Sequence, residues 1–323
     1  LAPTKVAAAC RPEHQLRVLR YADGANRGQG AAMSLALAHA RAELLAQMES
    51  DDERGPPDAF ARMLSELRAH ADWDGVSCGV ELCGWSRPGM QGYVAWQNGL
   101  LSPEAMAAER FVEIPALHQT AIFRRAAVEE VLRASGGAYR DGPLARPRGA
   151  GAPDDEGAVF GDALDVPVDM WWWLSFFHCG KRCGKVPGPP LFGWRQHPRQ
   201  HTRTHGRLSI ENLRRIKVHF LLRPGGPCSS PQCQRIVVVS VGATLRSWVT
   251  DLRAHPCCPP GGVCEAEWKP SKGGVGSQHH RPPPAAAAAA PATWRLWAFG
   301  NETARRRVAE QVPDFGARDI FVA

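Results

Sequence analysis

The sequence predicts an α/β protein made of two parts, and three observations carry that prediction. Segments that read as strands alternate with segments of helical periodicity along most of the chain. Residues 225–323 repeat a strand–helix–strand order, which is typical of a small parallel sheet. The composition, 44% hydrophobic and 22% charged over 323 residues, is that of a folded globular chain.

The first predicted part spans residues 1–224. Leu16–Tyr21 alternates like a half-buried strand, and a turn-rich segment follows it. Residues 142–157 are rich in Pro and Gly and predict a flexible loop. A helix is predicted over 31–47, passing into a strand near 44–48, and another helix begins at residue 57. Further helices are predicted over 123–134, 169–178 and 208–222, and a strand over 76–82.

The second predicted part spans residues 225–323 and is an α/β accessory module of unassigned role. Residues 256–292 combine clustered Pro and Gly with six consecutive alanines, so we expect a disordered insertion there. The elements predicted around it are strands over 235–241, 294–299 and 319–322, and helices over 245–252 and 302–312.

Charge and composition limit the partners. Lys plus Arg exceeds Asp plus Glu by 39 to 32, and the excess Arg gathers between Arg195 and Arg215, which favours an anionic partner. No stretch reaches the roughly 18–20 apolar residues that a membrane helix needs. The visible chain therefore reads as cytoplasmic, with the Golgi or endoplasmic reticulum open if a signal precedes Leu1. The cysteines fit no common zinc spacing.

Asn26 and Gly28 form a turn before an Ala-rich helix. Gly28-x-Gly30 is half of a dinucleotide-binding fingerprint, but Met33 stands where the third glycine belongs, so that interpretation fails. Glu49-Ser50-Asp51-Asp52 follows the helix. Such a cluster is either a solvated loop or a site for a divalent cation, which takes one or two carboxylates and a diphosphate.

Two later positions carry further chemistry. Asp169 begins an apolar helix, where an acid is either a favourable partner of the helix dipole or a general base. Arg195 and His197 follow Trp194, and an Arg–His pair can neutralise a phosphate. The three tryptophans Trp171–Trp173 cannot all face one side of a helix, so at least one is expected in the core.

In their order and spacing these motifs resemble family two glycosyltransferases, whose GT-A fold is a Rossmann-like nucleotide-diphospho-sugar transferase sheet. The resemblance covers roughly residues 16–205. It is carried by Asn26 and Gly28, Asp51 and Asp52, Arg124-Arg125 with Gly136-Gly137, Asp169, and Trp194-Arg195-x-His197. A closer likeness is to eukaryotic beta-1,3-N-acetylglucosaminyltransferase-like proteins, through Trp96-x-Asn98-x-Leu100, Ser102-Pro103-Glu104 and Val166-Pro167-x-Asp169.

The resemblance implies metal-dependent, inverting transfer of a sugar from a UDP-sugar to a hydroxyl on a glycan, lipid or protein. Asp51 would bind Mn²⁺ or Mg²⁺, and Asp169 would be the catalytic base. The residues implied in donor binding are Asn26, Gly28, Glu49, Arg195 and His197.

The sequence also departs from the family pattern. Glu49 replaces the first Asp, and Val168 replaces a Glu. Two family strands have no counterpart in residues 1–15, so we expect a GT-A sheet that is incomplete at its N-terminus. The alternative is an inactive glycosyltransferase-like binding or scaffold protein. A nucleic-acid binder is a third reading of the basic run, but no known nucleic-acid motif accompanies it, and no nucleic-acid partner is expected.

Overall fold

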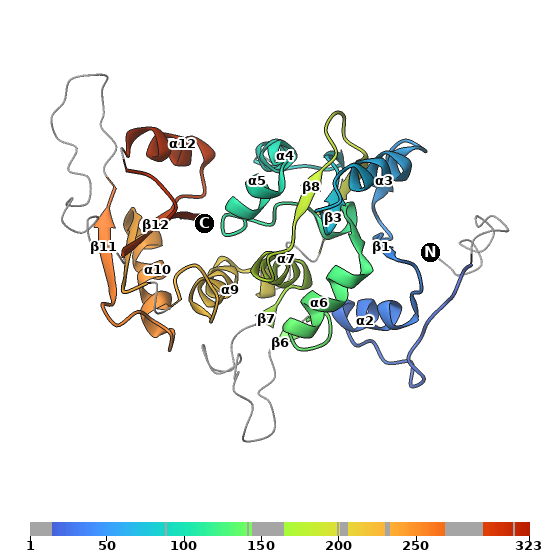
Figure 1. The fold of residues 1–323 in the computed structure, drawn as a ribbon, viewed down its shortest axis with the longest axis horizontal. Helices are drawn as coiled ribbons and strands as arrows, with labels where there is room; N and C mark the ends of the chain where they lie inside the picture. The colour runs from blue at the N-terminus through green and yellow to red at the C-terminus, as the bar shows by residue number, and fades with distance from the viewer. Residues whose placement is uncertain are drawn as a thin grey trace.

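The structure is a computed structural model and confirms the predicted mixed α/β class (Figure 1). It describes residues 15–87, 89–140, 142–143, 165–198, 200, 206–229, 233–268, 293–312 and 314–323. Within these ranges, no helix is both long and apolar enough to cross a membrane.

The first sheet has four short strands in the order β1-β5-β3-β8. Its strands are β1 (Leu44–Ala46), β5 (Ile122–Arg124), β3 (Gly75–Ser77) and β8 (Cys183–Lys185). Strand β3 pairs parallel to β8, and the other pairs are antiparallel. Helix α7 (Val168–His178) packs on this sheet through aromatic rings, with Trp172 and Trp173 centred 5.3 and 5.6 Å from Phe123. All three tryptophans are buried, which confirms the core role expected for at least one.

The second sheet places two loops of the site side by side. Its central strand β9 (Phe192–Gln196) runs parallel to β4 (Val80–Gly84) and antiparallel to β2 (Glu53–Arg54). Gly193 lies opposite Glu53, and a Cβ there would come within 2.8 Å of Cys83 Sγ and 3.2 Å of Glu53 Cβ. A glycine at this position therefore lets β2 and β4 close on β9. The closure brings residues 49–53 next to 194–197.

The remaining elements of the first part surround the two sheets, and local signals set their ends. The Ser102 hydroxyl accepts a hydrogen bond from the N–H of Ala105, and the Ser209 hydroxyl accepts one from the N–H of Asn212. These bonds cap the N-termini of the two helices that follow. Gly136 and Gly137 end a helix at φ of 99° and 88°, as predicted. The elements are α2 (Gln29–His39), α3 (Ala59–Ala69), α4 (Met90–Gly99), α5 (Pro103–Ala108), η1 (His118–Thr120), α6 (Arg125–Ala134), β6 (Gly142–Pro143), β7 (Asp165–Val166), η3 (Gly206–Leu208) and α9 (Ile210–Leu222).

The C-terminal module is the parallel α/β unit that the sequence predicts. Its sheet order is β11-β10-β12-β13, and every pair is parallel. Alternate residues of β10 enter two different apolar clusters, so helices cover both faces of the sheet (Figure 1). The elements are β10 (Arg235–Ser240), α10 (Gly242–Ala254), β11 (Val263–Glu267), β12 (Thr293–Ala298), α12 (Glu302–Gln311) and β13 (Asp319–Val322).

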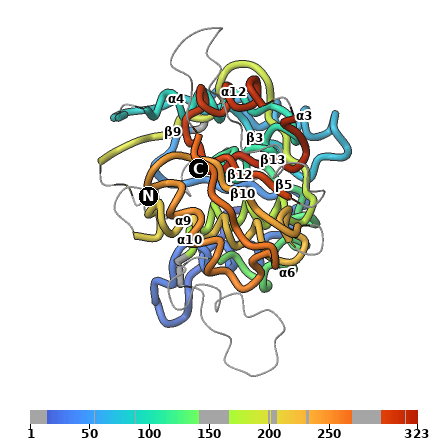
Figure 2. The backbone as a smooth tube through the Cα atoms, turned by 90° about the vertical axis from the view of Figure 1, so that its left-hand side faces the viewer, coloured from blue at the N-terminus to red at the C-terminus, as the bar shows by residue number. Residues whose placement is uncertain are grey.

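Helix α9 joins the module to the rest of the chain. It packs against α7 on one side and α10 on the other, as Figure 1 shows, and α9 and α10 are also neighbours in Figure 2. The large apolar core has members in both parts. Buried Asp251 of α10 accepts a 2.6 Å hydrogen bond from the Arg214 guanidinium. Buried Lys217 donates from Nζ to the carbonyl oxygens of Val112 and Ala323, at 2.9 and 2.6 Å. The module is therefore fixed by buried polar contacts as well as by apolar packing.

Several sequence predictions differ from the structure. The helix predicted over 31–47 ends at His39, and the helix predicted over 123–134 begins at Arg125, after β5. Residues 16–21 form no strand, and Leu16 and Val18 are exposed. The single strand predicted over 76–82 is two strands, β3 and β4, in different sheets. The predicted insertion 256–292 contains β11, which pairs with β10; the rest of it from residue 269, and most of the loop 142–157, lie outside the described residues.

Candidate functional site

Strand β9 sends alternate side chains to two sides of the site. Trp194 and Gln196 line a pocket, whereas the Arg195 guanidinium contacts the acidic segment 49–53. This follows from the period of two in a strand. Because β9 is held between β2 and β4, both sets of side chains are fixed in one register.

Two carboxylates of the acidic segment are partly buried and hydrogen-bonded. Asp52 accepts from Gln119 Nε2 and from the Arg195 N–H, both at 3.0 Å. Glu49 accepts from the amide groups of Gln29 (2.9 Å) and Gln47. Burial raises the pKa of both carboxyls, and these donors oppose the rise. The segment is thus an ordered cluster rather than a fully solvated loop.

Asp51 and Glu53 are the exposed acids of this segment, and Asp51 is the one that lies beside His197. Its side chain is 47% exposed, and its Oδ2 lies 4.0 Å from His197 Nε2. Its backbone oxygen accepts a 2.9 Å hydrogen bond from Arg195 Nε, while the Arg195 guanidinium also pairs with Glu53. Asp51, Arg195 and His197, which the sequence singles out separately, therefore meet at one exposed point.

Asn26 and Gly28 shape the start of α2 beside this cluster. The Asn26 side chain accepts a 3.0 Å hydrogen bond from the Gly28 N–H, and Gly28 has a φ of 86°, which favours glycine. The next residue, Gln29, donates to Glu49. Residues 26–28 thus place the start of α2 next to the acidic cluster. The side-chain oxygen of Asn26 accepts a hydrogen bond within this loop.

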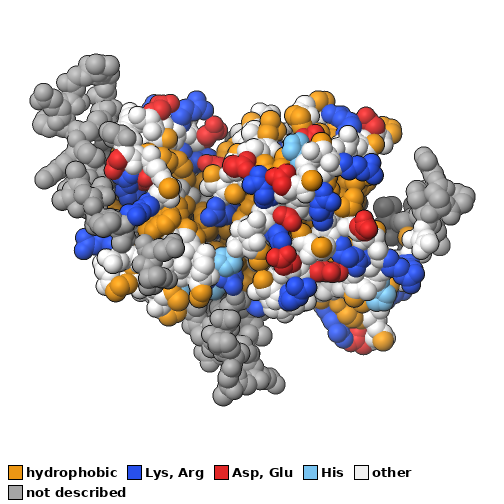
Figure 3. Space-filling model, in the orientation of Figure 1, with side chains coloured by type: hydrophobic (Ala, Val, Ile, Leu, Met, Phe, Trp, Pro, Cys, Tyr) orange, Lys and Arg blue, Asp and Glu red, His pale blue; other side chains and the backbone are white. Residues whose placement is uncertain are grey.

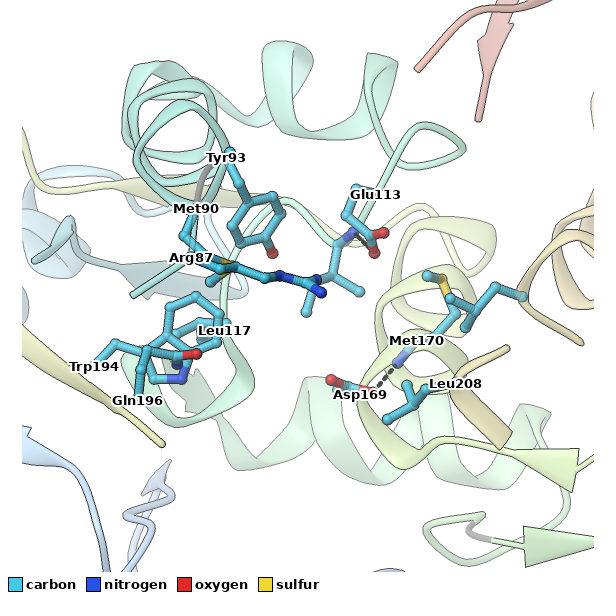
Figure 4. A pocket seen from close by; sticks show the side chains of 13 residues that line it. Arg87, Met90, Tyr93, Glu113, Leu117, Asp169, Met170, Trp194, Gln196 and Leu208 are labelled. Carbon is cyan, nitrogen blue, oxygen red and sulfur yellow. Dashed lines mark hydrogen bonds between the residues drawn. The ribbon is translucent and has the colours of Figure 1, made fainter. Parts of the chain in front are cut away.

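Asp169 lies in a neighbouring pocket of about 560 Å³ (Figure 4). It occupies the first turn of α7, and its Oδ1 accepts a 2.8 Å hydrogen bond from the Met170 N–H. Burial raises its pKa, and the charges of Glu113 and Glu49 raise it further. The pocket residues are Arg87, Gly89, Met90, Tyr93, Glu113, Ile114, Leu117, Asp169, Met170, Trp194, Gln196, Leu208 and Leu213.

The electrostatics connect the pocket to the acidic cluster. The negative charge of Glu49 contributes to the raised pKa of Asp169. On β9, Trp194 faces the pocket and its neighbour Arg195 faces the acidic cluster. The predicted site residues therefore gather around one region at the ends of β9 and α7 instead of scattering over the surface. Chemically, the region offers an exposed carboxylate beside a guanidinium and an imidazole, and a second carboxylate nearby whose pKa is raised by burial.

Sequence reasoning missed several residues of this region. Glu113, Arg87 and Tyr93 line the pocket, and Gln119 holds Asp52. The loop 113–121 carries no periodic pattern, and its contribution depends on contacts with distant segments. A weak signal existed in the closely spaced polar residues His118, Gln119 and Thr120 after an apolar stretch.

The acidic cluster fits a cation only in part. Within the described part of the chain, no group of three or more His, Cys, Asp or Glu side chains is arranged to hold a metal ion. Among the described residues of the segment, Glu53 is exposed but pairs with Arg195, whereas the carboxylate of Asp51 has the His197 ring as its ion-pair partner, 4.0 Å away. That chemistry suits Mg²⁺ or Mn²⁺, which take one or two carboxylates when substrate phosphates supply other oxygens.

Those arginines of the basic run that the structure describes do not gather in one patch. Arg214 and Arg215 pair with Asp251 at the α9–α10 contact, and Arg195 pairs with Glu53. On the face shown in Figure 3, acidic and basic side chains are interspersed over the first part of the chain. Arg214 and Arg215 thus stabilise the α9–α10 contact, and Arg195 belongs to the candidate site.

Comparisons with known proteins give one set of loose likenesses. No family profile matches the sequence, and no curated protein matches it. Solved structures of Staphylococcus aureus TarS residues 1–349 are similar: one in complex with UDP-GlcNAc at 12% identity and a TM-score of 0.42, and one in complex with UDP at 14% identity and 0.38. They cover 71% and 60% of this chain, which in turn spans 62% and 45% of theirs. Because these scores are low, the case for a function rests on the site's own geometry.

Proposed function

We propose that the protein is a metal-dependent glycosyltransferase that moves a sugar from a UDP-sugar to a hydroxyl acceptor with inversion. The observation that carries this is the pairing of two unlike acid environments around β9. An exposed carboxylate stands beside Arg195 and His197, and a partly buried, more basic carboxylate, Asp169, lines the adjoining pocket.

The acidic side of the site is suited to a nucleoside diphosphate. Asp51 would hold Mn²⁺ or Mg²⁺, and a bound cation would neutralise charge on the diphosphate. Arg195 and His197 would bind the same phosphate oxygens, Arg195 by exchanging its contact with Glu53. Glu49 and the turn of Asn26 and Gly28, which Gln29 connects, would bind the rest of the donor.

The pocket side is suited to proton removal. A base with a raised pKa accepts a proton from a sugar or alcohol hydroxyl more readily than an ordinary carboxylate does. The acceptor oxygen forms the new bond to the anomeric carbon, its proton passes to Asp169, and the bond from that carbon to the phosphate oxygen breaks. The electron pair leaves with UDP. Attack opposite the leaving group inverts the configuration.

The direct test measures UDP release from a panel of UDP-sugars, starting with UDP-GlcNAc, with Mn²⁺ or Mg²⁺ and after chelation. Asp51→Ala should lower turnover by about 10²- to 10³-fold, as loss of one charge-stabilising group does in other enzymes. Asp72→Ala is the matched control, because Asp72 is 62% exposed and pairs with Arg182 outside the site. Equal turnover in the native chain and Asp51→Ala would remove the metal role of Asp51.

One observation favours a second candidate, an inactive relative that binds a ligand without turnover. Arg195 is already engaged with Glu53 and with the backbone of Asp51, so it must break contacts before it binds a phosphate. This candidate predicts UDP binding by calorimetry with no UDP release from any donor. The finer likeness to beta-1,3-N-acetylglucosaminyltransferase-like proteins has no support from the comparisons.

A further inference from the structure

The pocket around Asp169 has two unlike walls. Trp194 and Gln196 of β9 form the wall nearer the acidic cluster. Met170, Leu208 and Leu213, from α7, η3 and α9, form the wall on the other side of Asp169; the first two are labelled there in Figure 4. The Asp169 carboxylate lies between these walls, so a hydroxyl that reaches it has an apolar surface behind it.

We propose that the acceptor carries an apolar body beside its reacting hydroxyl, and that Met170, Leu208 and Leu213 bind that body. The proposal rests on the proposed glycosyltransferase function and names the acceptor class of the same site. A body covered with hydroxyl groups would lose hydrogen bonds to water against this wall and gain none. An alkyl or aryl body loses nothing there and removes apolar surface from water.

Two features of the wall support an occupant. Leu208 and Leu213 are only half-buried, so part of their apolar surface faces the pocket instead of packed core. Ile210, three residues before Leu213 on the same helix, is 81% exposed. Residues three apart share a helix side, so apolar surface continues from the pocket wall outward along α9. A short alkyl chain would fill the wall, and a longer one would extend toward Ile210.

The polar lining is placed to orient the acceptor. Glu113 and Arg87 lie across the pocket from Leu208, on the side of α4 and the loop that follows α5 (Figure 4). This side also carries apolar Met90 and Ile114, so the pocket has a mixed side and, at Met170, Leu208 and Leu213, a purely apolar wall. Such a lining suits an amphipathic molecule. An alkyl glycoside has this character, with a hydroxyl-bearing head and an apolar tail.

The test compares methyl, butyl and octyl β-D-glucoside as ligands of the full chain, by calorimetry in the presence of UDP and Mn²⁺. Each methylene that the wall covers should tighten binding by about three- to fourfold, until the wall is filled. Leu213→Asn and, separately, Leu208→Asn should remove most of that chain-length dependence. Leu64→Asn is the control, because Leu64 is a half-buried leucine on α3 that does not line this pocket.

Each outcome decides the proposal. Equal affinity for methyl and butyl glucoside, or chain-length dependence unchanged in both leucine variants, would overturn it. Competition between octyl glucoside and UDP would also overturn it, because the pocket would then belong to the donor. UDP release from donor without added acceptor is measured in parallel, so failure of the proposed function is seen separately from failure of the acceptor class.

Discussion

The acidic cluster and Asp169 are acid sites in one region, yet their surroundings differ. Glu49 and Asp52 each accept hydrogen bonds from two side-chain or backbone donors, which favour the ionised carboxylate against burial. The Asp169 carboxylate accepts a hydrogen bond from the Met170 N–H in the first turn of its own helix, and the like charges of Glu113 and Glu49 raise its pKa. Burial is nevertheless the largest cause of a raised pKa at all three carboxyls, whereas Asp51, the acid proposed to bind the cation, is exposed to solvent. The difference teaches that exposure separates the carboxylate suited to a cation from the carboxylate suited to accepting a proton.

Replacing Asp169 should have the largest effect on the rate of sugar transfer. Asp169→Asn keeps the shape of the side chain and removes the proton acceptor, so transfer to an acceptor should fall by about 10²- to 10⁴-fold. UDP binding, measured by calorimetry, should stay within about twofold. Asp72→Asn should leave transfer unchanged, and full transfer by Asp169→Asn would contradict the assigned base.

Breaking the α9–α10 contact should affect stability instead of chemistry. Asp251→Ala leaves Arg214 without its buried partner, and loss of one member of such a pair costs about 3–5 kcal/mol. Chemical denaturation should show this loss. A cost under about 1 kcal/mol, the range of exposed pairs, would mean that the contact is not buried in solution.

A glycine substitution should disturb the acidic side while leaving Asp169 in place. Gly193→Ala puts a Cβ against Cys83 and Glu53, which should shift β2 and the attached segment 49–53. We expect about a tenfold fall in kcat/KM for the donor, since small misplacements of binding groups are costly. Gly92→Ala is the control, because no neighbouring atom lies near its Cβ position. Equal donor kinetics in the two variants would contradict the role of β2.

The like charge beside Asp169 gives a smaller, graded test. Asp169 must be ionised to accept a proton, so activity rises as pH rises through its raised pKa. Glu113→Gln removes one cause of that rise and should move the acid limb of the pH–rate profile to lower pH. Glu109→Gln is the control on a carboxylate outside the pocket. If the acid limb of the pH–rate profile did not move, the charge of Glu113 would not influence the pKa of the catalytic base.

The sequence predicted long periodic elements well and short ones poorly. The C-terminal β10, α10, β12 and α12 were recognised, because apolar periodicity and flanking Gly or Asn mark their ends. Strands β2, β8 and β9 were not, although the equally short β13 was predicted from its apolar run Ile320–Val322. The three missed strands contain no run of three apolar residues, and they form through pairing with distant chain.

The candidate site shows the same division. Local motifs indicated Asn26, Asp51, Asp169 and Arg195, which the structure gathers around β9. Glu113 and the apolar wall were missed, because they reach the pocket through a loop and through α9, whose positions depend on tertiary packing. The pKa direction of Asp169 was likewise beyond reach, since it depends first on burial and then on charges far away in sequence.

The alternation along β9 also determines where the chain tolerates added residues. Leu191 is anchored on both sides, donating to the Gly79 carbonyl and accepting from the Gly55 N–H, each at 3.0 Å. One residue inserted after Leu191 would turn Arg195 into the pocket and Trp194 toward the carboxylates, so the pocket would gain a cation and the acidic segment would lose one. A two-residue insertion would restore the sidedness but shift each contact along the strand. Length at this point in the chain is therefore under tighter constraint than the identity of most neighbouring side chains.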